Sequence, residues 1–159
     1  NGAAINVLGQ DGKIVINSQD FSIDKSSLRI GSSRNTQEAN LIINAQGNIN
    51  ATNNSNINSN GSSINIKAGD IYFNNTRLSS PAGSRNAGNI SINARNSINL
   101  VNSGISSDSN GVGNGGTIDI SAKLLSLSNG ALIYTRALKE GNAGNVKVNA
   151  DDINIVGVN

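Results

Sequence analysis

Two tyrosines and two arginines are the residues of this chain whose chemistry suits recognition of a sugar. Tyr72 and Tyr134 each have an arginine close by in the sequence, Arg77 and Arg136 respectively. An aromatic ring can stack on a sugar ring, and a guanidinium donates hydrogen bonds to sugar oxygens. Tyr72 and Tyr134 are therefore candidate glycan contacts. The alternative interpretation is that both are isolated surface aromatics, which need no special explanation.

Acidic residues are the next candidates, because clustered carboxylates serve acid–base catalysis and calcium binding. The chain has ten Asp and Glu residues but no His and no Cys. Most of the acids are scattered. Asp20, Asp70 and Asp152 do recur just before an apolar pair, where a solvated turn residue explains them. The sequence therefore predicts no catalytic residue, no metal site and no cofactor.

The charge of the chain argues against two further classes of partner. Lys and Arg number 12 against ten acids, and charged residues make up only 14% of the chain. No basic stripe interleaved with aromatic residues is present, so we expect no nucleic-acid partner. No apolar run approaches the roughly 20 residues that cross a bilayer as a helix.

The chain also opens without Met, and we expect it to be a processed piece of a longer protein.

The elements that must position these residues follow from a repeating apolar pattern. Pairs of aliphatic residues separated by one position recur at intervals of 23 to 28 residues, which is the pattern of short strands with one buried face. A second pair follows about seven residues later, and a third apolar position follows after a similar interval. The first pairs of the successive repeats are Ile14/Ile16, Leu41/Ile43, Ile64/Ile66, Ile90/Ile92, Ile118/Ile120 and Val146/Val148.

Three short strands per repeat, with abundant Asn, Ser and Gly between them, predict a solenoid rather than a helical repeat. We expect an all-β chain folded as a three-sided parallel β-helix of about six coils. The usual handedness of parallel crossovers makes a right-handed coil the expected form. A single segment would span residues 1–159, with a partial coil over 1–13 and later coils starting at residues 14, 41, 64, 90, 118 and 146.

Asparagine at the corners is the second repeating feature. After the first strand of four coils stand Asn17, Asn44, Asn93 and Asn149. Stacked coils would align them, and we expect their amides to form a hydrogen-bonded ladder. A longer turn carries the phrase Asn-Ala-Gly-Asn at residues 86–89 and again at 142–145. Because these copies start 56 residues apart, the sequence predicts a unit of two coils with one such turn in each unit.

The phrases "RNAGNISINARNSINLVNSGISSDS", "LLSLSNGALIYTRALKEGNAGNVKVNA" and "DDINIV" resemble the repeat region of cyanobacterial filamentous haemagglutinin-like exoproteins of two-partner secretion systems. The resemblance is strongest from Asn86 onward and weaker over Asn1 to Ser80. It implies a right-handed parallel β-helix, export through an outer-membrane secretion partner, and a location at the cell surface or outside the cell. It transfers no catalytic residue to this chain.

The ends of the predicted coil stack complete the expectation. No capping helix or charged block is evident, so we expect either further repeats in the same chain or other copies stacked end to end. The function predicted from the sequence is that of a structural and adhesive shaft segment of a secreted filament, without catalysis. The alternatives are a carbohydrate-binding module that uses surface glycans as partners and, less favoured, a polysaccharide-degrading β-helix enzyme.

Overall fold

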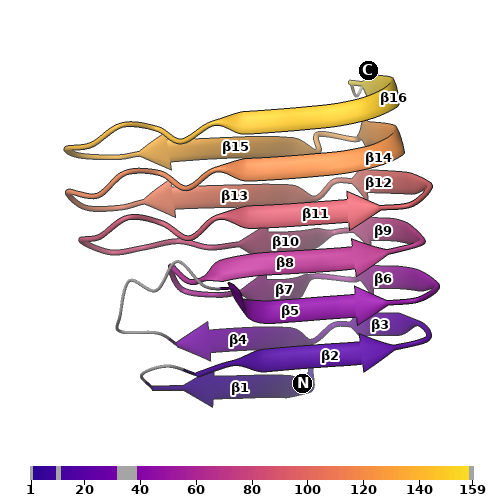
Figure 1. Cartoon of the computed structure of the whole chain (residues 1–159), viewed down its shortest axis with the longest axis horizontal. Helices are drawn as coiled ribbons and strands as arrows, with labels where there is room; N and C mark the ends of the chain where they lie inside the picture. The colour runs from indigo at the N-terminus through magenta and orange to yellow at the C-terminus, as the bar shows by residue number, and fades with distance from the viewer. Residues whose placement is uncertain (1, 10–11, 32–38, 158–159) are drawn as a thin grey trace.

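The computed structural model describes residues 2–9, 12–31 and 39–157, and every regular element within these ranges is a β-strand. Consecutive strands lie in different layers, and each strand pairs in parallel with its equivalents in neighbouring coils (Figure 1). The all-β solenoid predicted from the sequence is therefore confirmed. It has about five turns, whereas about six coils were expected, because the last repeat contributes only one long strand.

The strands form three faces, which we number in the order in which the chain visits them. The first face contains β2 (Ile14–Ser18), β5 (Ala39–Ala45), β8 (Ser63–Ala68), β11 (Ile90–Ala94) and the first halves of β14 (Ile118–Ser128) and β16 (Val146–Val156). The second face contains β3 (Phe21–Asp24), β6 (Asn48–Thr52), β9 (Asp70–Asn74), β12 (Ser97–Val101) and the second halves of β14 and β16. The third face contains β1 (Ala4–Leu8), β4 (Ser27–Gly31), β7 (Ser55–Asn58), β10 (Thr76–Ser79), β13 (Gly104–Ser109) and β15 (Leu132–Ala137).

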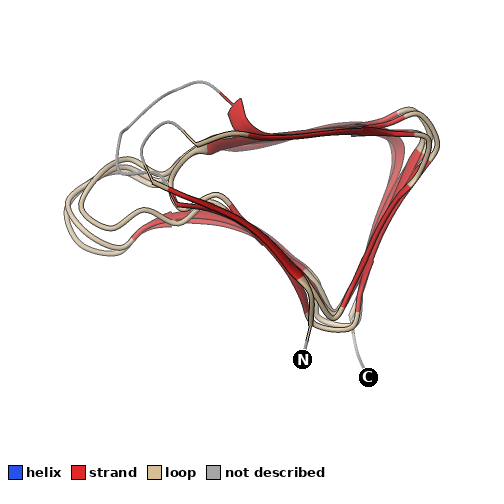
Figure 2. Cartoon of the chain, turned by 90° about the horizontal axis from the view of Figure 1, so that it is seen from below, coloured by secondary structure: helices blue, strands red, loops and turns tan. Residues whose placement is uncertain are grey.

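Two tight corners and one longer turn connect these faces. The first corner joins the first face to the second, and the second corner joins the second face to the third. Viewed along the stack, the coils superpose on a triangular outline, and the long turns project together from one vertex (Figure 2). In β14 and β16 the strand continues around the first corner, so the first and second faces are joined in one sheet.

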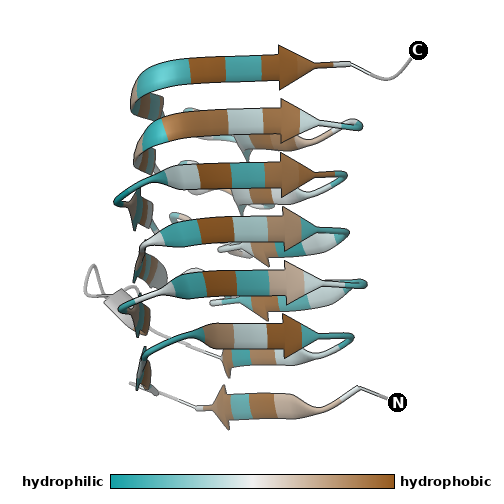
Figure 3. Ribbon diagram, turned by 90° about the vertical axis from the view of Figure 1, so that its right-hand side faces the viewer, coloured by the Kyte–Doolittle hydropathy of each residue, from teal (hydrophilic) through white to brown (hydrophobic). Residues whose placement is uncertain are grey.

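The core is built from rows of aliphatic side chains that stack along the solenoid. Ile43, Ile66 and Ile92 lie in register on successive strands of the first face, and each is at most 1% exposed. Figure 3 shows the corresponding banding on the second face, with apolar positions aligned from strand to strand. Ala51 pairs in register with Phe73, which is fully buried. The small side chain thus leaves room beside the largest core residue, as close packing of an interior requires.

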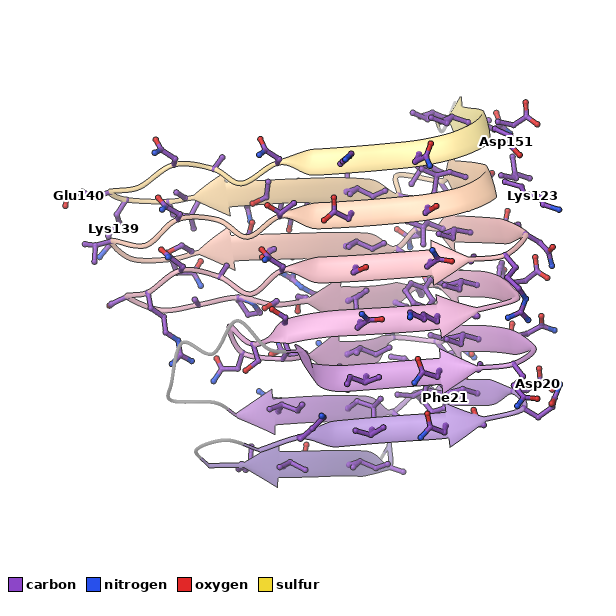
Figure 4. All side chains as sticks on the ribbon, in the orientation of Figure 1. Asp20, Phe21, Lys123, Lys139, Glu140 and Asp151 are labelled. Atoms are coloured by element: carbon purple, nitrogen blue, oxygen red, sulfur yellow. The ribbon has the colours of Figure 1, made fainter. Side chains whose placement is uncertain are left out.

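Charged side chains lie at the rim of the coils. Figure 4 shows Asp20, Lys123 and Asp151 along the first corner, and Lys139 with Glu140 at the tip of a long turn. A charge in the apolar interior would be costly unless it were paired. The surface chemistry of the molecule is therefore concentrated at the corners, in the long turns and on the outward positions of the strands.

Candidate functional site: polar columns and a groove on the third face

The column of residues that contains the predicted Asn ladder lies at the end of the first face. Asn17 and Asn44 are in register, and the Asn44 Nδ2 atom donates a hydrogen bond of 3.0 Å to the Asn17 Oδ1 atom. Lys67 lies between Asn44 and Asn93 in this column, and Ser121 lies between Asn93 and Asn149. The structure therefore brings two of the four asparagines together. Asn93 and Asn149 have no Asn neighbour in the column, so no ladder runs through all four.

Two acids of the first corner, Asp20 and Asp70, bond to the next coil. The Asp20 Oδ1 atom accepts a hydrogen bond of 2.6 Å from the backbone N–H of Asn48. The Asp70 carboxylate accepts bonds from the backbone and hydroxyl of Ser97 and from the amide of Asn96. The bonds from Ser97, and next those from Asn96, lower the pKa of Asp70 from its ordinary value. These carboxylates therefore join one coil to the next.

The second corner contains a column that the sequence did not single out. Residues at this corner adopt a positive φ in successive coils, including Asn75 at 50°, Asn102 at 45° and Asn129 at 53°. Asparagine tolerates this left-handed conformation better than other non-glycine residues. The Asn102 Nδ2 atom also donates a 2.5 Å hydrogen bond to the Asn75 Oδ1 atom. The signal in the sequence was an Asn directly after β6, β9, β12 and β14, although Lys25 takes this place after β3.

The long turn contains a further asparagine column, formed by Asn86, Asn114 and Asn142. The side-chain oxygen of Asn86 accepts a 2.8 Å bond from the backbone N–H of Asn114, and Asn114 accepts an equal bond from Asn142. These residues recur every 28 positions. The predicted two-coil unit is therefore wrong, because the intervening coil makes the same turn with the sequence Asn-Gly-Gly-Thr in place of Asn-Ala-Gly-Asn.

The glycine of this turn allows the coils to approach closely. A Cβ atom built on Gly116 would lie 2.3 Å from the carbonyl oxygen of Gly88, and one on Gly144 would lie 2.2 Å from that of Gly116. Ser107 reinforces the contact, since its hydroxyl donates a 2.6 Å bond to the Gly88 oxygen. Close backbone approach explains why the phrase retains Gly where the neighbouring positions vary.

A charged and aromatic cluster lies on the third face. The guanidinium of Arg136 bonds the Asp108 carboxylate of the preceding coil at 3.1 Å, and the Asp108 side chain is only 5% exposed. The hydrogen bond to Asp108 raises the pKa of Arg136. The same guanidinium lies over the Tyr134 ring, 4.5 Å from its centroid, which is the distance of a cation–π contact. The arginine therefore connects the acid to the aromatic ring.

The two candidate glycan contacts lie on different faces. Tyr72 points outward from β9 on the second face, is 37% exposed, and has Asn50 and Asn99 as its neighbours in register. Tyr134 lies on β15 of the third face. The structure therefore does not bring Tyr72 and Tyr134 into one patch, and any sugar site must use one of them.

Tyr134 borders an open groove of about 420 Å³ on the third face. Gly104 and Ser106 lie between Arg77 on one side and Leu132 with Tyr134 on the other. Arg77, Gly104 and Leu132 are in register on β10, β13 and β15, and the lining continues past Arg77 to Asn56 of β7. The spacing of strands places β10 and β15 roughly 10 Å apart on either side of Gly104.

Two other kinds of feature are absent from the part of the chain that the structure describes. Within residues 2–9, 12–31 and 39–157, no three acid, His or Cys side chains gather where they would hold a metal ion. The same part of the chain contains no helix that is long and apolar enough to cross a membrane. Comparison of the chain with protein-family models, with curated proteins and with solved structures found no match.

Proposed function

We propose that this chain is a shaft segment of a secreted filamentous protein, located outside the cell or at its surface. Its proposed role is structural and adhesive. The segment acts as a stiff rod that spaces or links other parts of the filament and the surfaces to which the filament adheres. The proposal includes export through an outer-membrane partner, which is what the resemblance of the repeats to haemagglutinin-like exoproteins implies. It includes no catalytic step, because Asp20 and Asp70 direct their carboxylates at the adjoining coil.

The observation that carries the proposal is the parallel pairing of strands from coil to coil together with the apolar rows at the ends of the stack. Ile153 and Ile155 of β16 are 54% and 72% exposed, although their equivalents in the coil below, Leu125 and Leu127, are buried or partly buried. At the other end, Ile5 of β1 is 53% exposed. Another coil of the same kind would cover these rows and pair with the edge strands.

Such a contact joins unlike ends, so it is open-ended and builds filaments. The partners in this proposal are therefore flanking repeats or further copies of the chain, stacked end to end.

Electron cryo-microscopy of the protein, purified without denaturant, tests this function. We expect continuous rods with an axial repeat of about 4.8 Å, the spacing of hydrogen-bonded strands. Discrete particles no longer than the coils described here would contradict the filament proposal. Images recorded before and after dilution would also distinguish covalent continuation from stacking of separate chains, because only stacked chains dissociate on dilution.

A further inference from the structure

We propose that the groove on the third face is a binding site for an acidic sugar unit of a polysaccharide, such as a uronic acid. This inference goes beyond the structural role proposed above and does not depend on it. The groove lies on the outward surface of the third face and reaches β15, the edge strand of that sheet. A coil stacked on this end would lie beside β15 and leave the outward surface open, so a single molecule or a filament can present the groove.

Gly104 lies at the floor of the groove, and the fold does not require glycine at this position. The φ angle of Gly104 lies outside the left-handed region, and a Cβ atom added there would meet no atom within 4 Å. Glycine within a strand weakens the strand and leaves no side chain to pack. The other positions of this column, Asn56, Arg77 and Leu132, all have side chains. The missing side chain opens the floor of the groove and has no other structural purpose on β13.

The groove carries one positive charge. Arg77 is exposed and is the only charged residue among the described residues that line the groove. Within the described part of the chain it forms no ion pair, since Arg136 and Asp108 make the one salt bridge found there. A guanidinium presents paired donors that match a carboxylate, so an unpaired arginine beside an open floor favours an anionic ligand over a neutral one.

Asn56 adds a polar atom whose bonding capacity the fold does not use. Its Oδ1 atom is shielded from solvent and has no hydrogen-bond partner among the described residues. Buried polar atoms are nearly always paired, so each exception needs an explanation. Asn56 also lines the groove, so a sugar hydroxyl bound beside Arg77 can donate to this oxygen once the amide turns toward the groove.

The ring of Tyr134 is held in one orientation by its neighbours. The buried Asp108 carboxylate holds Arg136, and Arg136 lies over the Tyr134 ring. The ring is therefore supported on one side while it lines the groove. A ring held in place loses little conformational entropy when a ligand stacks on it. Asp108 and Arg136 are thus positioning residues for Tyr134.

The dimensions agree with a short piece of polysaccharide. A volume of about 420 Å³ lies within the range of roughly 300 to 1,000 Å³ that small-molecule sites occupy. Apolar surface from Tyr134 and Leu132 faces the sugar ring, while Arg77 and nearby asparagines, such as Asn56, supply polar contacts. This mixture of a stacking surface and a few directed polar groups is the usual composition of a ligand site.

Isothermal titration calorimetry of the chain with oligogalacturonate tests the proposal. We expect binding of this acidic oligomer and about tenfold weaker binding of its carboxyl-reduced, neutral form, because one charge-assisted contact is lost. Gly104→Leu fills the groove and is expected to abolish binding without lowering the thermal midpoint. Arg77→Gln keeps a polar side chain of similar length, and it is expected to weaken binding of the acidic oligomer to that of the neutral one.

Matched controls locate the site. Tyr72→Ala removes the tyrosine of the second face, and Gly83→Leu places a side chain at another unobstructed glycine outside the groove; both are expected to bind as the unmodified chain does. Absence of binding to oligogalacturonate would overturn the proposal, as would full binding by Gly104→Leu. Equal affinity for acidic and neutral oligomers, or binding of a sulfated oligomer alone, would overturn the assignment of a carboxylate ligand.

Discussion

At the scale of single residues, the polar side chains of this protein act along the axis of the solenoid. Asp20, Asp70 and Asn86 each accept a hydrogen bond from the coil that follows. A tight bend exposes backbone N–H groups that the sheet ladder does not satisfy, and a short acceptor side chain from the coil below reaches them. The same residue types that make the chain look disordered by composition therefore stabilise its corners.

Acid should destabilise the first corner. Asp70 has a lowered pKa in the folded protein because of its bonds to Ser97 and Asn96. Its contribution to the free energy of unfolding is complete above the ordinary carboxyl value of 3.8 and is lost as the pH falls through the lower folded value. Thermal midpoints measured from about pH 6 to pH 2 should fall more steeply for the unmodified chain than for Asp70→Asn. An identical acid limb in both proteins would contradict this assignment, and Asp119→Asn on the first face serves as the control.

Substitution at the long turn should expose the cost of separating two coils. In Gly116→Ala the new methyl group would lie 2.3 Å from the Gly88 oxygen and 2.4 Å from the Ser107 hydroxyl. Since one of these atoms belongs to the backbone, we expect the free energy of unfolding to fall by about 1 to 3 kcal/mol in chemical denaturation. Gly83→Ala is the matched control, because nothing lies within 4 Å of its Cβ position. Equal stability of the two variants would show that the turn relaxes without cost.

At the scale of the strand, alternation decides which side chains enter the core. Ile64, Ile66 and their equivalents on β11 point inward, whereas Asn65 and its equivalents do not. Because side chains alternate strictly between faces, a slip of one residue would expose the whole row. Each strand inside the stack pairs on both sides with strands that carry the same pattern, so the register is set repeatedly.

A charge on the inner row should therefore unfold the solenoid, whereas the same charge one residue away should not. Ile66 is fully buried, and Ile66→Asp is expected to lower the free energy of unfolding by more than about 4 kcal/mol or to prevent folding. Asn65→Asp places an almost isosteric carboxylate on the outward side of the same strand, and it should change stability by less than about 0.5 kcal/mol. Circular dichroism during urea titration compares them, and a tolerated Ile66→Asp would contradict the assigned core.

At the scale of the whole molecule, the stack presents apolar rows and strand edges at its ends and polar groups along its sides. Ile153 and Ile155 are more exposed than any of the core residues to which they correspond. Unpaired strand edges of this kind template further strands. The proposed filament follows from this contrast between apolar ends and polar sides.

Changing the end row should weaken end-to-end association. Ile155→Lys places a charge where the next coil would lie, and we expect the chain to sediment as a smaller species than the unmodified protein at equal concentration. Asn154→Lys puts the same charge on the outward side of β16 and is expected to associate as before. Association that is unaffected by Ile155→Lys would contradict stacking at this end.

Much of this architecture is determined by the sequence alone. Aliphatic alternation at a period of 23 to 28 residues predicts parallel strands with one buried face, and each paired row, such as Ile90 with Ile118, is found in register. The strands and corners can be predicted from such local patterns because every coil has the same two structural requirements. One face of each strand must be buried, and the chain must bend tightly between strands. The handedness of the coil and the extracellular role stay predictions.

The tertiary structure decided the features that depend on the contact between coils. The ion pair between Arg136 and Asp108, the hydrogen bond between Asn102 and Asn75, and the 28-residue turn column all follow from which residues stack. The groove at Gly104 likewise exists only because Arg77 and Leu132 flank it on neighbouring coils. Such contacts join residues about one coil apart, and a sequence read along its length specifies each coil but not the neighbours that stacking places across from each side chain.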